Sequence, residues 1–148
     1  MSRVIQALLA GMLFTFILDF FLFLGIKLNY IDKFEIDLYY NILFADNQNI
    51  FLYLLLSIIF GFLIIYANNK ISLLVTSIAS LLIASTLIEP IGESVAEFML
   101  MQKNVSLHYK NHTYIGDIYY KGRSDITFYD YKLEKIITLD KKNIKGVQ

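Results

Sequence analysis

Three long apolar runs, separated by short polar segments, dominate the first two thirds of the chain. They cover residues 4–26, 50–66 and 71–88, and Asp19 in the first run is the only charged side chain in any of them. An α-helix needs about 20 apolar residues to cross the hydrocarbon core of a bilayer. The pattern therefore predicts three transmembrane helices, the second of which is near the minimum length.

The first run, preceded by Arg3, could also be read as a secretory signal peptide. It is longer than the apolar core of such a peptide, however, no small-residue cleavage site follows it, and further apolar runs lie downstream. We therefore expect residues 4–26 to remain in the protein as a helix.

Residues 27–49 form a connection rich in aromatic and acidic side chains. Its apolar positions recur at helical spacing, at Ile31, Phe34, Leu38, Ile42 and Ala45. This spacing predicts a short amphipathic helix at the membrane surface, with its tyrosines among the lipid headgroups. A partner-binding surface is the alternative. The polar run 46–49 predicts a turn and the N-cap of the next helix.

Residues 67–70 are a short polar connection, which predicts that the second and third helices form an antiparallel hairpin. Three spans place the amino terminus and the tail on opposite sides of the membrane. Small residues also recur every four positions on the first and third helices, where they allow close helix packing in lipid. We expect the two stripes to touch, and they consist of Ala7, Gly11 and Thr15 on one helix and Thr76, Ser80 and Ala84 on the other.

Carboxylates supply the candidate chemistry. Asp19 and Glu89 lie at comparable depth when residues are counted along the two helices at about 1.5 Å each, and Glu93 and Glu97 continue the row of Glu89. Two carboxylates at one depth would share a proton, which predicts an ion or proton site. The alternative is structural. Asp19 would then bond to a hydroxyl such as Thr86 or Ser85, and Glu93 and Glu97 would face solvent on an extension beyond a Pro90 kink.

After residue 102 the spacing becomes alternating, and β-branched and aromatic residues become dense. Strands are predicted at 105–109, 114–120, 126–131 and 135–139, with a fifth at 144–147. Gly116 marks a bulge or bend in the second strand. The sequence thus predicts a three-helix transmembrane bundle at 1–102, followed by a five-stranded barrel-like β domain at 103–148.

The tail resembles the small barrels of the SH3-type and Sm-like families. The segments that carry the resemblance are VSLH at 105–108, YIGDI at 114–118, ITFYD at 126–130, IITL at 136–139 and NI at 143–144. The resemblance implies a partner-binding barrel. Three membrane helices followed by a β domain are also similar to the core of small mechanosensitive channels, although the third helix lacks the Gly/Ala pore pattern of that family.

Composition supports the membrane class, because 57% of the 148 residues are hydrophobic. Thirteen basic and thirteen acidic side chains cancel, and the tail lacks a basic-aromatic signature, so no nucleic-acid partner is expected. The chain has no cysteine, and its two histidines, His108 and His112, fall in a strand-and-turn region where their spacing does not make a metal site.

No nucleophile–base arrangement, phosphate loop or cofactor motif is present, so neither an enzyme nor a cofactor is expected. We expect an accessory, assembly or scaffold protein of the inner (cytoplasmic) membrane, whose β domain docks to a partner complex. The alternative is a homo-oligomeric channel or an ion- or proton-coupling transport subunit. Lysines at 27, 33, 103 and 110, against Arg3 and Lys70, favour a cytoplasmic tail.

Overall fold

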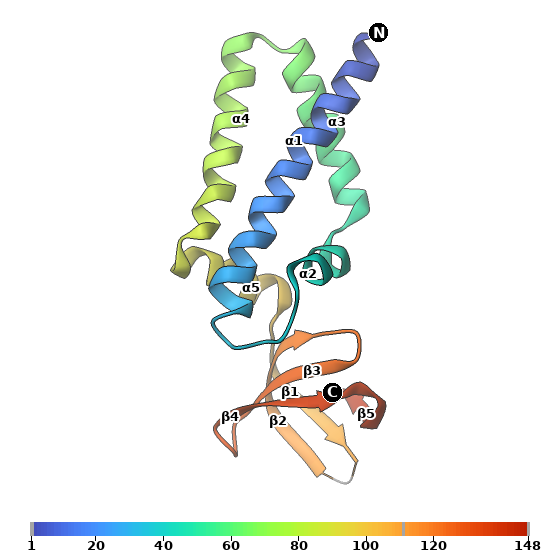
Figure 1. The fold of residues 1–148 in the computed structure, drawn as a ribbon, viewed down its shortest axis with the longest axis vertical. Coiled ribbons are helices and arrows are strands. Elements are labelled where there is room, and N and C mark those ends of the chain that lie inside the picture. The colour runs from blue at the N-terminus through green and yellow to red at the C-terminus, as the bar shows by residue number, and fades with distance from the viewer. Residues whose placement is uncertain (1, 111, 148) are drawn as a thin grey trace. The chain divides into compact units, whose positions relative to one another are not determined.

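The computed structural model describes residues 2–110 and 112–147. The chain divides into two compact units, Met1–Glu93 and Ser94–Gln148. The first is helical and the second is built around an antiparallel sheet (Figure 1). The predicted order of a helical part followed by a β part is confirmed. The division falls nine residues before the predicted boundary, inside helix α5 (Glu89–Leu100).

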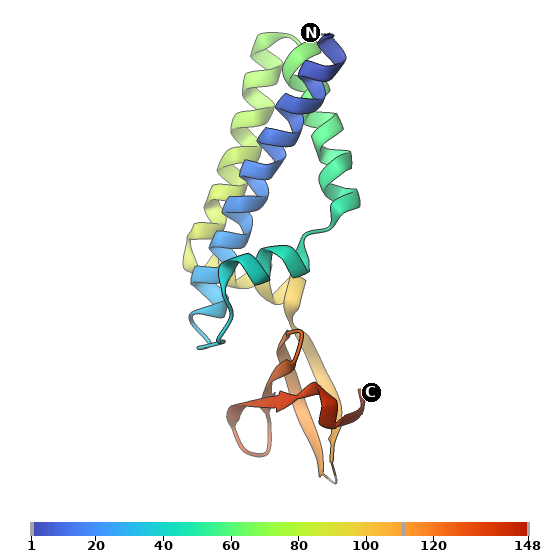
Figure 2. The same ribbon diagram turned by 45° about the vertical axis from the view of Figure 1, so that its right-hand side comes forward.

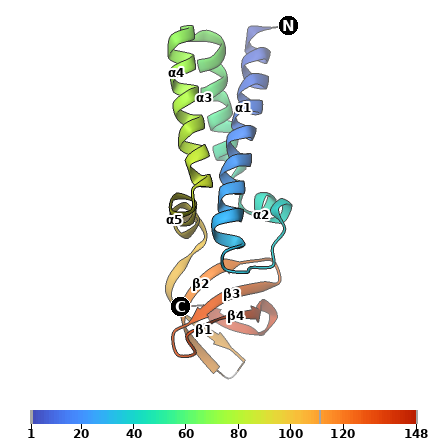
Figure 3. The same ribbon diagram turned by 60° about the vertical axis from the view of Figure 1, so that its left-hand side comes forward.

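Helix α1 (Arg3–Ile26) begins where the Ser2 hydroxyl accepts a hydrogen bond from the Val4 N–H, and it continues as a π-helical turn, Lys27–Ile31. Helices α3 (Ile50–Tyr66) and α4 (Asn69–Ala84) each begin with an asparagine N-cap, at Asn49 and Asn68. The three apolar runs are therefore helices at the predicted positions. In Figure 3, the α3–α4 turn and the amino terminus lie at the same end of the helical unit.

Two helical stretches, Arg3–Ile31 and Asn69–Leu87, are long and apolar enough to cross a membrane. A third candidate is the pair formed by α2 (Tyr40–Asn47) and α3, which is bent by 84° at its break. Figure 2 shows α2 running across the direction of α3. The helical unit thus holds two candidate spans, or three if the bent pair counts as one.

The single amphipathic helix predicted across residues 31–45 is wrong in its extent. Only Tyr40–Asn47 is α-helical, because Ile31 completes the π-turn of α1 and Glu35 adopts a left-handed backbone conformation with φ of 52°. A residue with positive φ cannot continue a right-handed helix. The apolar side chains of this segment nevertheless pack inward, and Ile31 and Leu43 are fully buried.

The run that begins at Asn69 breaks before the acidic cluster. It tightens into a 3₁₀ turn, Ser85–Leu87, and Ile88 is extended, with ψ of 125°. Helix α5 then begins at Glu89. The predicted interruption at Pro90 is confirmed. Proline has no N–H and its ring clashes with the carbonyl group four residues earlier, so it cannot continue the preceding helix, but it is tolerated in the first turn of a new one.

The β unit is a five-stranded antiparallel sheet in the order β4-β3-β2-β1-β5. Its strands are β1 (Gln102–Tyr109), β2 (His112–Lys121), β3 (Asp125–Asp130), β4 (Lys135–Asp140) and β5 (Ile144–Val147). The pairings place β4 and β5 at the two edges. Its apolar core consists of Val105, Leu107, Ile118, Ile126, Phe128 and Leu139.

Gly116 has an ordinary backbone conformation for a strand, so it is not needed for a positive φ. It is needed for space. A Cβ atom at this position would lie 1.8 Å from the carbonyl oxygen of Tyr129 on β3, which is closer than any real contact. The bulge predicted at Gly116 lies elsewhere, because the register of β2 against β3 shifts between Ile118 and Tyr120. Gly116 instead allows the close approach of β2 and β3.

Candidate functional site

The small-residue stripe of α1 packs against α3. A Cβ added at Gly11 would lie 1.8 Å from the Ser57 carbonyl oxygen, and one at Gly61 would lie 2.1 Å from the Ala7 carbonyl oxygen. Ala7, Gly11 and Thr15 are all buried. Two backbones can approach this closely only through small residues.

The predicted partner of this stripe was wrong. Thr76, Ser80 and Ala84 lie on α4, none of whose described residues is buried. Ser80 and Ala84 instead line a shallow hollow of about 170 Å³ beside Leu18. Ser57 and Gly61, four residues apart on α3, form the matching stripe, and both were visible in the sequence.

Two hydroxyls in this helix interface lack a hydrogen bond within the described part of the chain. They are the Oγ1 atom of Thr15 and the Oγ atom of Ser57, and each side chain is 1% exposed. A buried hydroxyl without a hydrogen-bond partner lowers the free energy of unfolding, so these two hydroxyls destabilise the α1–α3 interface.

Asp19 accepts a hydrogen bond of 3.0 Å from the side-chain amide of Gln48, which lies just before α3. It is partly exposed, on the face of α1 near Tyr40, whose hydroxyl donates to the Phe20 carbonyl oxygen. Neither Thr86 nor Ser85 is its partner, because their hydroxyls donate to carbonyl oxygens of their own helix. The sequence predicts only a turn at residues 46–49, but the amide of Gln48 in this turn is also a hydrogen-bond donor for the carboxylate.

Glu89 and Glu93 share one cation. The Nζ atom of Lys33 lies 3.0 Å from a Glu89 carboxylate oxygen and 2.7 Å from one of Glu93. These hydrogen bonds, first that of Glu93, raise the pKa of Lys33. Asp19 and Glu89, which the sequence predicts to share a proton, thus have different partners in this structure, Gln48 and Lys33. The break at Ile88 starts a new helix, and its first turn presents Glu89 and Glu93 to Lys33.

Glu97 belongs to the second unit, where its carboxylate lies 2.9 Å from the Nζ atom of Lys103. The row of carboxylates predicted along one helix face thus divides between two lysines. Within residues 2–110 and 112–147, no group of three or more His, Asp or Glu side chains is placed to hold a metal ion. His108 bonds the Thr113 hydroxyl, at 2.9 Å, whereas His112 lies opposite Tyr109 in the sheet.

Close contacts hold the helical break in place. The Asn29 side-chain amide donates to the Thr86 carbonyl oxygen at 2.8 Å, and a Cβ at Gly25 or Gly92 would lie 2.6 Å or less from an atom of Thr86. The end of α1 is therefore fitted to the 3₁₀ turn, which fixes where α5 begins.

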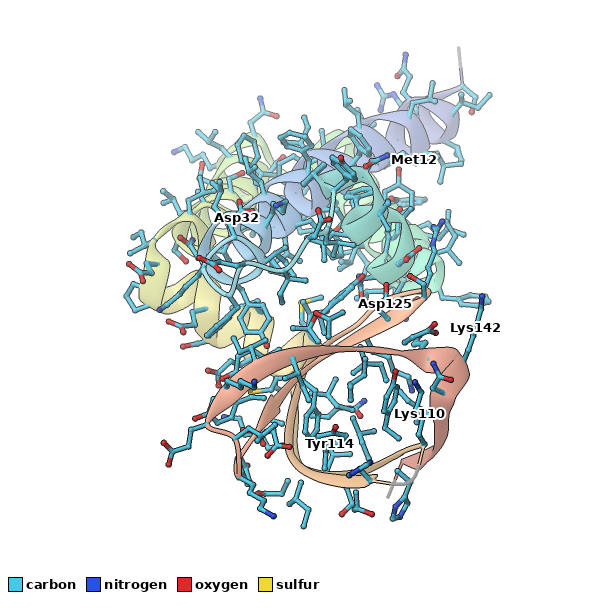
Figure 4. The ribbon with its side chains drawn as sticks, turned by 60° about the horizontal axis from the view of Figure 1, so that its bottom comes forward. Met12, Asp32, Lys110, Tyr114, Asp125 and Lys142 are labelled. Atoms are coloured by element: carbon cyan, nitrogen blue, oxygen red, sulfur yellow. The ribbon has the colours of Figure 1, made fainter. Side chains whose placement is uncertain are left out.

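A groove of about 580 Å³ opens on the β unit. It is lined by residues 112–115, the first four of β2, and by residues 130–133, which end β3 and begin the turn to β4. We call it the β2 groove. Figure 4 shows Tyr114 directed into the curve of the sheet and Lys142 directed away from it.

Tyrosines cover the outer face of the sheet next to the β2 groove. The rings of Tyr119 and Tyr129 stack at 6.0 Å, and the ring of Tyr131 meets that of Tyr129 at 6.2 Å. The Tyr131 hydroxyl donates to Asp117 at 2.6 Å, and this hydrogen bond raises the pKa of Tyr131. One wall of the groove is thereby held in place.

Comparison with known proteins returns no relative: no protein-family model, no curated protein and no solved structure matches the chain. The class that the structure itself defines is a chain with an apolar helical unit and a small antiparallel β unit.

Proposed function

We propose that this chain is a small accessory, assembly or scaffold protein of the inner (cytoplasmic) membrane, in which the helices are the anchor and the β unit docks to a protein partner. The observation that carries the proposal is the β2 groove, an open site with exposed apolar side chains on a unit that has its own core. We further propose that the curved sheet is a small barrel, as its resemblance to SH3-type domains implies.

Exposed apolar side chains on the helices support the membrane anchor. On α4, Leu73, Leu81 and Leu82 are 65–71% exposed, and none of the described residues of this helix is buried. Soluble monomers rarely expose contiguous apolar surface on this scale. In a bilayer these leucines would contact lipid.

Site-specific photo-crosslinking tests the docking function. A photoreactive amino acid replaces Leu133, in the β2 groove, and in a matched control replaces Lys142, outside it. In native membranes we expect the Leu133 probe, and not the Lys142 probe, to cross-link to one defined second protein. Products that contain only copies of this chain would contradict docking to a partner.

The competing proposal is transport by a homo-oligomer. It is favoured by Asp19, a carboxylate in an apolar helix whose hydrogen-bond partner is a neutral amide. Transport requires that purified protein in lipid vesicles conducts ions or protons and that the Asp19→Asn variant folds but loses this conduction. Vesicles without conduction would leave docking as the function.

A further inference from the structure

Among the residues that the structure describes, one strand edge in the β2 groove has no pairing partner. Pairing of β2 with β3 ends at Gly116 and Asp130, and the last backbone bond runs from the Tyr131 N–H to the Ile115 carbonyl oxygen, at 3.0 Å. Residues 112–114 of β2 extend past this point, with β1 on their other side. Since backbone groups two residues apart in a strand point the same way, the N–H and C=O groups of Thr113 face the groove.

We propose that this edge binds an extended, acidic segment of a partner protein, which adds to the sheet as a strand along residues 112–115. The inference rests on the proposed docking function and specifies its mode. Strand addition draws affinity from main-chain hydrogen bonds and specificity from pockets for alternate side chains. The N–H and C=O groups of β2 that face the groove therefore favour a partner segment in extended conformation, whose own backbone groups can pair with them.

The turn that faces the open edge is held in shape before any partner binds. The buried Asp130 carboxylate accepts hydrogen bonds from the N–H groups of Lys132, at 2.7 Å, and Leu133, at 3.1 Å. Glu134 completes the turn with φ of 50°. A preformed groove lowers the ordering cost of binding.

Side chains beside the edge define the chemistry of the bound segment. Ile115 and Leu133 are 56% and 49% exposed and offer apolar contacts. Lys132 has no ion pair among the described residues, while the carboxylate of Asp130 is already engaged by backbone N–H groups. The Asp130 carboxylate keeps its negative charge but is only 3% exposed, so the charge that the groove presents to a ligand is that of the exposed Lys132. This favours a segment carrying Asp or Glu between apolar residues.

The size of the groove suits this occupant. A volume of about 580 Å³ falls within the range of about 300–1,000 Å³ that is typical of binding clefts. It accommodates a short extended segment, whereas a helix packing broadly on the sheet would leave the backbone edge unpaired.

A displayed library of random seven-residue peptides tests the mode of binding, with the full chain held in lipid nanodiscs. We expect selected peptides to alternate β-branched and acidic residues. Leu133→Asp and Lys132→Glu should each weaken their binding at least tenfold, while Lys142→Glu, a matched charge reversal outside the groove, should not. Methylation of alternate backbone nitrogens in the peptide should abolish binding.

The inference is overturned if the selected peptides bind the groove variants as well as the unchanged chain, or if backbone methylation has no effect. Selection of no peptide at all overturns it too. Circular dichroism and thermal unfolding of each variant exclude loss of fold as the cause of weaker binding. If Leu133 cross-links to a partner in membranes while Lys132→Glu leaves that complex intact, docking stands and strand addition fails. If peptides bind as expected but no partner cross-links, docking fails alone.

Discussion

At the scale of single residues, two glycines in the β unit differ in what surrounds them. A Cβ at Gly116 would meet the Tyr129 carbonyl oxygen at 1.8 Å, whereas one at Gly122 would meet its nearest atom, the Asp125 carbonyl oxygen, at 3.1 Å. Both atoms belong to the backbone of β3, and a shift of a few tenths of an ångström relieves a contact of 3.1 Å but not one of 1.8 Å. Gly116 is therefore the residue on which the spacing of β2 and β3 depends.

Replacing Gly116 by alanine should destabilise the β unit by about 3 kcal/mol, the upper end of the usual range for overpacking. Gly122→Ala, the matched control, should cost about 1 kcal/mol or less, because its neighbour needs to shift by only a few tenths of an ångström. Chemical denaturation of the full chain, followed by tyrosine fluorescence, measures both. Equal losses would show that β2 and β3 are not in this close register.

At the scale of elements, the helix pair that matters is α1 with α3. Their backbones approach through Gly11 and Gly61, and the rings of Phe14 and Phe60 meet edge to face, with centroids 5.0 Å apart. Helix α4 contributes no buried residue from its described part and shares only partly filled hollows with α1. In this bundle α1 and α3 are therefore closely packed, and α4 is packed less closely against them.

Cysteine cross-linking measures this pairing in the membrane, and the chain has no native cysteine to interfere. Phe14→Cys combined with Phe60→Cys should form a disulfide or react with a short bifunctional reagent. The control pairs Leu13→Cys with Phe60→Cys, because Leu13 is 63% exposed whereas the Phe14 ring contacts that of Phe60. Equal yields from the two pairs would contradict the α1–α3 interface.

At the scale of the whole molecule, orientation follows from the number of spans and the lysine distribution. The α3–α4 turn and the amino terminus share one end of the helical unit (Figure 3), so three spans would put the tail on the side opposite both. Lys27 and Lys33 follow α1, and Lys103 and Lys110 follow the last span. Because positive residues near membrane ends stay inside, we expect the β unit to face the cytoplasm.

Fusions to alkaline phosphatase in a bacterial host test this orientation, since the enzyme is active only outside the cytoplasm. A fusion after Gln148 should have low activity, and one after Asn68, in the α3–α4 turn, should have high activity. The reverse result would place the β unit outside. Similar activities at both positions would show that α4, the candidate span between them, does not cross the membrane.

Several features were determined by local sequence alone. The three apolar helices, the asparagine caps of α3 and α4, the break before Glu89 and the five strands all depend on the spacing of apolar residues, on N-cap chemistry and on proline geometry. These effects act over a few residues, so they can be predicted without knowing what lies nearby in space.

Which helix faces and side chains contact one another depends on the tertiary structure and could not be predicted from local sequence. Small residues on α1 could match a stripe on either α3 or α4, and the selection of α3 depends on the helix connections and on the backbone contacts of Gly11 and Gly61. Likewise, Lys33 contacts Glu93, which lies 60 positions later, and Gln48 contacts Asp19, which lies 29 positions earlier. Both contacts form because the chain turns back after α1 and after α2. The β2 groove arises because β2 pairs with β1 from His112 onward but with β3 only from Gly116 onward, a difference in register that no single strand encodes.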